Sequence, residues 1–327
     1  MRRREFITLI GCTAVTWPLA TRAQQPAMPV IGLLGSSSFH DRSHLLTAFR
    51  QSLNDLGYVE GRTVAFEYRS AEGQYERLPL LAAELVRHQV AVIVTSGAPA
   101  SALAAKAATT TIPIIFVTGG DPIALGLVAS LNRPGGNMTG VSLFNVVLVP
   151  KQLELVRELV PEAGVIAALV NPNNPNTETE VRELEMAARA LRLNVHVLRA
   201  IVKEDFDSAF TSMVQQRAGA IIVSYDSFFT SHRDQLVALA ARHSLPAVYH
   251  WREFAESGGL ISYGTNLTDS YWQMGTYAGK ILQGARPADL PVQQPTKFEL
   301  VINLSTAKAL GLTVPHSLLS RADELID

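Results

Sequence analysis

The chain has 327 residues, of which 47% are hydrophobic, 28 are basic and 29 are acidic, so its formal net charge is −1. This near balance gives no reason to expect nucleic acid or an acidic membrane surface as a partner. After the amino-terminal segment, no run of 18 or more apolar residues predicts a membrane span. The length suits one large α/β unit or two domains of ordinary size.

Residues 1–23 predict an export signal. A basic cluster at 2–4 precedes an apolar stretch at 6–20, and small residues lie three and one positions before a cut after Ala23. The paired arginines at 3–4 resemble the twin-arginine signal of bacteria, whose cargo crosses the membrane folded. The alternative is a frayed basic terminus ahead of a buried helix. We therefore expect the mature protein to be periplasmic.

The only cysteine, Cys12, lies inside this segment. Residues 9–12 resemble a lipoprotein cleavage box, but that cut would leave an apolar segment of only about six residues, below the usual length. A lipid anchor on Cys12 is therefore the less favoured alternative. A chain cut after Ala23 has no thiol, so it can hold neither a disulfide nor a cysteine metal site.

Beyond the signal, short runs rich in Val and Ile alternate with longer segments of helical periodicity. In 43–56, Leu45, Phe49 and Leu53 fall on one face and Gly57 ends the helix. This alternation predicts parallel sheets, because parallel strands are joined through crossover helices. The predicted strands of the first half are 30–34, 64–68, 90–95, 112–117 and 138–144, and its helices include 43–56 and 100–108.

The second half repeats this plan with similar spacing between strand starts, which predicts two lobes of the same architecture. Its predicted strands are 165–170, 194–198, 220–224, 247–250, 260–263 and 298–302, and its helices are 150–159, 177–191, 206–216, 231–243 and 270–282. We expect lobe 1 to comprise 29–144 with 266–300, and lobe 2 to comprise 145–265 with 301–327. Two or three linking strands would then form a hinge.

Candidate ligand-binding residues lie in the loops after the strands, because ligands of open parallel sheets bind beyond the carboxyl ends of the strands. These loops are rich in hydroxyls, amides and glycine, which suits a small polar ligand. The candidates are Ser36, Ser38, Ser96, Gly97, Ala98, Asp121, Asn173, Asn174, Tyr225, Asp226 and Trp251.

The first-lobe serines have two interpretations. Ser96 precedes the predicted helix 100–108, whose free N–H groups and positive dipole end favour an anion such as a carboxylate. The alternative is a serine that only caps the helix, which contributes about 1 kcal/mol. Ser36 and Ser38 carry the same ambiguity before the helix at 43–56.

The remaining candidates are also open to a structural role. Asp226 follows a buried strand, where its carboxylate either pairs with a ligand ammonium or caps a helix. Tyr225 and Trp251 either stack on a ligand or belong to the core. Asp121 precedes a proline, which is typical of a turn.

Enzyme motifs are missing from the sequence. It has no Gly-x-Ser-x-Gly elbow, no Walker loop and no His-Glu-x-x-His, and its eight histidines are scattered. The sequence therefore predicts a protein that is not an enzyme, with no catalytic residues, cofactor or metal.

Several stretches resemble one protein family over nearly the whole chain after the signal. They are 57–61, 121–128, 133–140, 151–155 and, most specifically, 298–304 running into 307–312. They are similar to the ABC-transporter substrate-binding family that includes tryptophan- and tyrosine-binding lipoproteins. The resemblance implies a type I periplasmic-binding-protein fold with two Rossmann-like lobes, a single solute closed between them, and delivery to a membrane permease driven by a separate ATPase. We expect a monomer.

The resemblance also implies roles for two residues. In amino-acid-binding members, hydroxyls and N–H groups of the first lobe hold the carboxylate, and an acid of the second lobe holds the amine. Ser96 and Asp226 match these places by position. The first loop, 36–40, matches no specificity known in the family, and the signal departs from that of the lipid-anchored relatives.

We therefore expect the solute-binding component of an importer, for an aromatic or other amino acid or a similar small carboxylate. One alternative is a sensory binding protein that presents its closed state to a receptor. Another is an enzyme or a sugar-type transcription regulator built on the same lobes. The regulator would need a helix-turn-helix head where residues 1–23 predict a signal.

Overall fold

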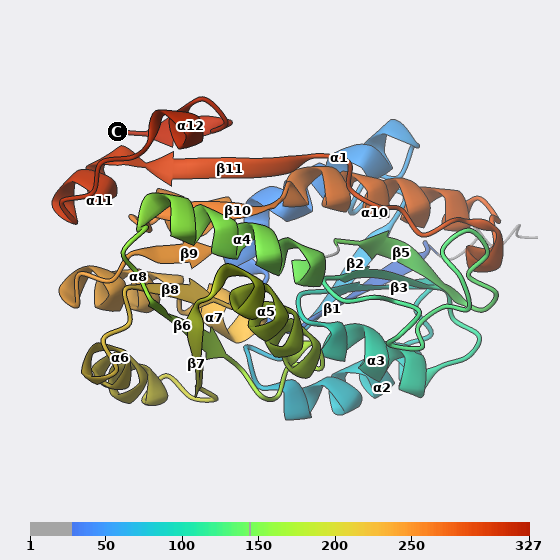
Figure 1. Ribbon diagram of the computed structural model, residues 1–327. Helices are drawn as coiled ribbons and strands as arrows, with labels where there is room; N and C mark the ends of the chain where they lie inside the picture. The colour runs from blue at the N-terminus through green and yellow to red at the C-terminus, as the bar shows by residue number, and fades with distance from the viewer. Residues whose placement is uncertain (1–27, 144) are drawn as a thin grey trace, which may run out of the picture.

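A computed structural model describes residues 28–143 and 145–327. The predicted signal over residues 1–23, Cys12 included, lies outside this part of the chain. The described residues form two sheets with helices on both faces of each (Figure 1). The predicted α/β fold with two lobes is confirmed.

Lobe 1 contains a five-stranded parallel sheet in the order β2-β1-β3-β4-β5. Its helices α1 and α10 pack together over one face, and α2 and α3 cover the other (Figure 1). Because both faces are covered, β3 and β4 are buried along their whole length. The elements are β1 (Val30–Gly35), η1 (His40–Arg42), α1 (Ser43–Asp55), β2 (Ala65–Ser70), η2 (Tyr75–Arg77), α2 (Leu78–Arg87), β3 (Val92–Ser96), α3 (Pro99–Ala108), β4 (Ile114–Thr118), β5 (Met138–Ser142), α10 (Leu267–Leu282) and η3 (Pro287–Asp289).

Lobe 2 contains a seven-stranded sheet in the order β12-β11-β10-β9-β8-β6-β7. Its pairs are parallel except β10 with β11, which is antiparallel. Helices α4 and α5 cover one face, and α6, α8 and α9 the other. The elements are α4 (Asn145–Leu159), β6 (Val165–Val170), α5 (Thr177–Leu191), β7 (Asn194–Arg199), α6 (Asp205–Gln215), β8 (Ala220–Val223), α7 (Ser227–Ser231), α8 (Arg233–Arg242), β9 (Ala247–Tyr249), α9 (Arg252–Glu256), β10 (Ile261–Thr265), β11 (Phe298–Asn303), α11 (Leu304–Ala309), α12 (His316–Leu319) and β12 (Glu324–Ile326).

The chain passes between the two lobes three times: from β5 to α4, from β10 to α10, and from α10 to β11. Thr265 Oγ1 donates to the carbonyl of Leu143 at 3.2 Å, so two of these crossings are tied together. Gln293 N donates to Gly140 O at 2.8 Å, so the last crossing first runs along β5. Such connecting segments can act as a hinge when two lobes move relative to each other. The lobe boundaries given above stay a prediction.

Most predicted strands and helices are confirmed to within a few residues, and β6 and α5 match their predicted bounds. The helix predicted over 231–243 is confirmed as α8, within two residues at each end. The short helix α7 before it was not predicted, and the carboxylate of Asp226 caps its start directly after β8. The predicted start of a helix at Pro150 is wrong, since α4 begins at Asn145 and Pro150 lies inside it.

One apolar cluster extends through both lobes. It contains Leu33 and Val94 from the first sheet together with Phe206, Tyr225 and Phe228 from lobe 2. Two further clusters fill the space under α4 and α5, and under α2 and α3. The shared cluster means that the lobes are packed against each other.

Candidate functional site

The carboxyl ends of β1 and β3 face that of β8, and three hydrogen bonds join the two lobes there. The Ser36 hydroxyl contacts the Ser227 hydroxyl at 2.8 Å. The phenol of Tyr225 donates to the carbonyl of Gly97 at 2.6 Å. The third bond runs from the phenol of Tyr75 to Asp226 Oδ2, also at 2.6 Å. The cleft between the lobes is therefore closed in this structure.

The close approach of the two lobes requires a glycine at position 97. Its φ is +91°, and a Cβ there would lie 2.0 Å from Ser36 Oγ and 2.7 Å from Ser227 Oγ. Ser36 Oγ also accepts a hydrogen bond from Ala98 N at 2.7 Å, which satisfies a free N–H ahead of α3. Ser96 is buried below, where its carbonyl accepts from Ser101 Oγ. The helix-capping alternative for Ser96 is wrong, because the residue at the cap of α3 is Ala98.

Asp226 is the centre of a buried polar network. Its side chain accepts from Asn171 Nδ2 and Phe228 N on Oδ1, and from Asn174 Nδ2 and the Tyr75 phenol on Oδ2. Burial raises the pKa of the Asp226 carboxyl, although all four donors act in the opposite direction. Asp226 therefore caps α7 and links loops of both lobes.

Tyr225 occupies the middle of the cleft. Its ring packs edge-on against Trp251 with centroids 5.2 Å apart. The ring fits because residue 119 is glycine, where a Cβ would lie 2.5 Å from it. Burial raises the pKa of Tyr225, so its hydroxyl stays protonated and acts as a donor.

Two buried polar residues were missed from the sequence. Arg42 is only 6% exposed and donates to Tyr271 at 3.4 Å. Asn145 is 1% exposed, and neither polar atom of its side chain has a hydrogen-bond partner in the described structure. Both had a signal: Arg42 is a cation at a helix N-terminus, which the dipole disfavours, and Asn145 directly follows the predicted strand 138–144.

A buried acid–imidazole pair lies beneath the cleft. Glu180 Oε1 lies 3.9 Å from His250 Nε2 and accepts a hydrogen bond from Tyr225 N. Burial raises the pKa of Glu180 to about 8 and lowers the pKa of His250 to about 4. Both side chains are therefore uncharged near neutral pH.

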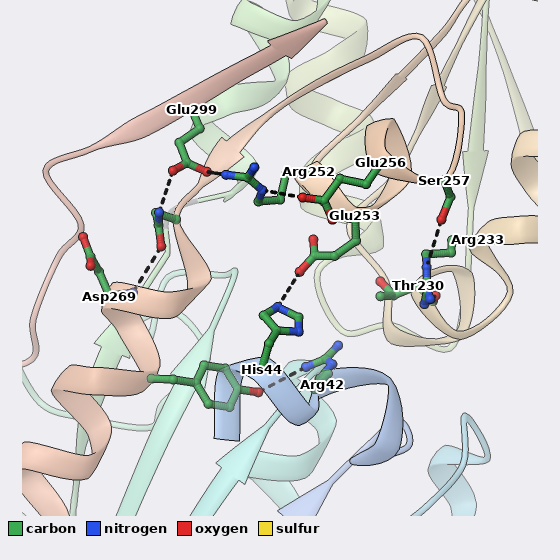
Figure 2. A network of polar contacts seen from close by, with 12 residues as sticks. Arg42, His44, Thr230, Arg233, Arg252, Glu253, Glu256, Ser257, Asp269 and Glu299 are labelled. Carbon is green, nitrogen blue, oxygen red and sulfur yellow. Dashed lines mark hydrogen bonds and ion pairs between the residues drawn. The ribbon is translucent and has the colours of Figure 1, made fainter. Parts of the chain in front are cut away.

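A second group of polar contacts closes the rim on the side of α1 and α9, as Figure 2 shows. His44 of α1 contacts Glu253 of α9 at 3.1 Å, and Arg252 pairs with Glu256 and Glu299. His44 is half exposed, so solvent screens its contact with Glu253.

Two cavities lie near the lobe interface. One, of about 390 Å³, is lined by both lobes, including Gly119, Gly120, Asp121 and Asn176. The other, of about 310 Å³, lies at the rim described above and is lined by His44, Trp251 and Glu253 among others. Volumes in this range suit a small molecule.

The structure brings together most of the predicted ligand residues. Those at the lobe interface are Ser36, Gly97, Ala98, Asn174, Tyr225, Asp226 and Trp251. Asp121 lines the larger cavity, but its carboxylate accepts from Ile123 N in a turn. Ser38 accepts from His40 N, and Asn173 is exposed with its backbone N–H bound to Asn171. Contact of any of these residues with a ligand stays a prediction.

Over residues 28–143 and 145–327, no three His, Cys, Asp or Glu side chains gather as metal ligands would. None of the helices in that same part of the chain combines the length and the apolar character that crossing a bilayer requires.

Comparison with known proteins agrees with this architecture. Residues 37–326 match the family model described as ABC transporter substrate binding protein. The tyrosine-binding protein of Clostridioides difficile strain R20291 is 28% identical over 264 residues, which are 81% of this chain and 75% of that protein.

Solved structures are similar over 91% of this chain and 99% of each relative. An ABC domain from Streptococcus pneumoniae in complex with L-Trp has a TM-score of 0.82 at 28% identity. A conserved domain protein from Vibrio cholerae has a TM-score of 0.84 at 26% identity. A ligand-free, open substrate-binding protein from Clostridium difficile has a TM-score of 0.65 at 25% identity. The chain therefore belongs to the ABC transporter substrate-binding protein family, whose members bind a solute and do not transform it.

Proposed function

We propose that this protein captures one small polar solute between its lobes outside the cytoplasm and presents the closed form to the permease of an ABC importer. The observation that carries the proposal is the group of buried polar atoms without partners at the lobe interface. Among the described residues these include both amide atoms of Asn145, Trp251 Nε1 and Asn176 Nδ2. Buried polar atoms normally have hydrogen-bond partners, so a set of orphans around one cleft fits a bound ligand.

The closed arrangement of the lobes supports capture by closure. The TM-score is higher to the complex with L-Trp than to the ligand-free, open relative, although the identities are similar. A ligand stabilises the closed form only through contacts that are better there than in the open form. Residues from both lobes surround Tyr225, which meets that requirement.

The first experiment is to identify the solute. Protein purified without denaturation from its native envelope would be analysed by mass spectrometry for a released small molecule. The purified solute should then raise the melting temperature, since a ligand at 100 times its Kd adds about 2.7 kcal/mol. Amino acids are one class to include, because the C. difficile relative is named for tyrosine.

Two outcomes would contradict the proposal. One is a protein that retains no solute and is stabilised by no candidate. The other is one that converts a candidate into a product. Export is tested separately, by fractionating cells that carry the full chain or a chain lacking residues 1–23. Recovery of the full chain in the cytoplasm would remove the periplasmic part of the proposal.

A further inference from the structure

A third cavity lies within lobe 2, apart from the lobe interface. It has a volume of about 330 Å³ and is lined only by residues of the segments 237–260 and 305–310. Helices α8 and α11, which contribute to its walls, lie at the end of lobe 2 away from lobe 1 (Figure 1). None of its lining residues lines either cavity near the interface. A molecule bound here would therefore not compete with a solute in the cleft.

Small residues create the space. Helix α8 contributes Ala240 and Ala241, helix α11 contributes Ala309, and the turn before β10 contributes Gly258 and Gly259. At position 259, a Cβ would lie 2.7 Å from the carbonyl oxygen of residue 254 and 2.7 Å from a ring carbon of residue 249. The walls are therefore regular elements and a fixed turn, so the cavity is formed before any ligand binds.

The cavity is uncharged. Among the described residues that line it, none is Asp, Glu, Lys, Arg or His. Its inner wall includes Leu245, Ala247 and Leu260, each at most 5% exposed, and its exposed edge includes Ser244 and Ser305. An ion would lose hydration here without gaining a counter-charge. The cavity is therefore suited to a neutral, largely apolar molecule.

One buried polar atom of the wall has no partner. Tyr249 lines the cavity and is 1% exposed, and its hydroxyl makes no hydrogen bond in the described structure. Its ring stacks on Phe254 with centroids 4.5 Å apart, which fixes its position. Burial raises the pKa of Tyr249, so the hydroxyl stays protonated and is a donor. Buried hydroxyls are normally paired, so this one indicates a partner from outside the protein.

Water is a poor candidate for that partner. A buried water needs about two to four polar neighbours. Here Thr306 Oγ1 donates to Gly258 O at 2.8 Å, and Leu245 N donates to Ala240 O at 2.9 Å, so these groups are already bonded to each other. The space is also larger than a few waters require, since an apolar cavity of about 150 Å³ holds a benzene molecule.

We propose that this cavity is a second ligand site, independent of the cleft. Its ligand is a neutral, largely apolar molecule of one or two rings with one hydrogen-bond acceptor, which accepts from the hydroxyl of Tyr249. The site goes beyond capture of a solute between the lobes, because no residue of lobe 1 takes part in it.

The test uses three probes of nearly equal shape: acetophenone, α-methylstyrene and benzoate. The first offers a neutral acceptor, the second replaces that oxygen by a CH₂ group, and the third is charged. Isotope-labelled protein purified from its native envelope is titrated with each probe and followed by amide NMR. Acetophenone should shift amides in 240–249 and 305–310 and bind about three- to tenfold more tightly than α-methylstyrene. Benzoate should leave these amides unshifted.

Three results would overturn the inference. They are no shift in these segments with any probe, equal affinity for acetophenone and α-methylstyrene, and binding of benzoate as tight as that of acetophenone. None of them bears on the proposed function, because the cleft is not involved.

A first variant tests the hydrogen bond. Tyr249→Phe should remove the advantage of acetophenone and leave the affinity for α-methylstyrene unchanged. Tyr277→Phe is its control, because that buried phenol donates to Pro291 O and lines no part of the cavity. If folded Tyr249→Phe keeps the preference for acetophenone, the inference is wrong.

A second pair of variants tests the location. Ala241→Phe should narrow the cavity from its exposed edge and weaken both neutral probes at least about tenfold. Ala83→Phe is the matched control, since Ala83 is an exposed alanine on α2 of lobe 1. Ala309→Phe, on α11, gives a second readout if Ala241→Phe fails to fold. Unchanged affinity in folded Ala241→Phe and Ala309→Phe would place the probes elsewhere and overturn the inference.

Discussion

Removing one phenolic oxygen should open this protein in the absence of ligand. The Tyr225 hydroxyl donates to the carbonyl of Gly97 across the lobe interface at 2.6 Å, and no other partner of that carbonyl is found in the described residues. In Tyr225→Phe the closed form would bury an unsatisfied carbonyl, whereas the open form would leave it hydrated. The cost is about 1–3 kcal/mol. The closed-to-open ratio should therefore fall at least about fivefold.

Single-molecule energy transfer measures this ratio directly. Residues 24–327 contain no cysteine, so dyes can be placed on cysteines substituted for Leu80 of α2 and Val214 of α6, both exposed. In Figure 1 these helices lie on the side away from β11 and α10, where the chain crosses between lobes, so opening should separate them. The ligand-free variant should spend more time at low transfer efficiency than the parent.

Tyr277→Phe is the control for this experiment. Its phenol donates to the carbonyl of Pro291, so it removes a similar bond within one lobe. Tyr277→Phe should lower the free energy of unfolding without changing the distribution of transfer efficiencies. If Tyr225→Phe remains folded and its distribution equals that of the parent, the hydrogen bond to Gly97 does not hold the lobes together.

Two further predictions concern stability. Gly97→Ala should lower the free energy of unfolding by more than Gly57→Ala. Gly57 has a similar positive φ, but the space around it is open. Equal losses of about 1–2 kcal/mol for the two variants in urea titrations would mean that the close approach of residue 97 to Ser36 carries no cost. Folded protein holds a proton on Glu180 up to a pKa of about 8, while unfolded protein loses it near 4.5, so this group makes stability fall as pH rises between those values. Glu180→Gln should flatten that fall in urea titrations from pH 5 to 8.5, and an unchanged slope would show that Glu180 is ionised in the folded state.

The hydrophobic periodicity of the sequence was sufficient to predict the two lobes. Apolar runs such as 165–170 and the amphipathic helix over 177–191 gave the correct bounds, because each is buried on the faces that its pattern indicates. The strand-end rule also placed Ser36, Gly97, Tyr225 and Asp226 at one interface. These features depend on residues that are close in the sequence, so sequence patterns were enough to predict them.

What the sequence could not supply was pairing across the interface. Nothing near Tyr75 in the chain indicates that its phenol reaches Asp226, 151 residues later. Arg42 stands at a predicted helix N-terminus, but only the fold shows that it is buried and that it donates to Tyr271. The capping role of Asp226 was one of two open alternatives, and only the count of its four donors distinguishes a saturated carboxylate from an available one.

The order in which the lobes are completed has a consequence for synthesis. The face of the first sheet covered by α1 is finished only by α10, and the second sheet gains β11 and β12 only from the last 30 residues. In a nascent chain that still lacks Leu267 and the residues after it, both lobes are incomplete and apolar faces of their helices are uncovered. At ribosomal speeds of about 5–20 residues per second, that exposure lasts for seconds. Neither lobe can mature ahead of the other, so a truncated chain should be a substrate for chaperones and proteases rather than a smaller working half.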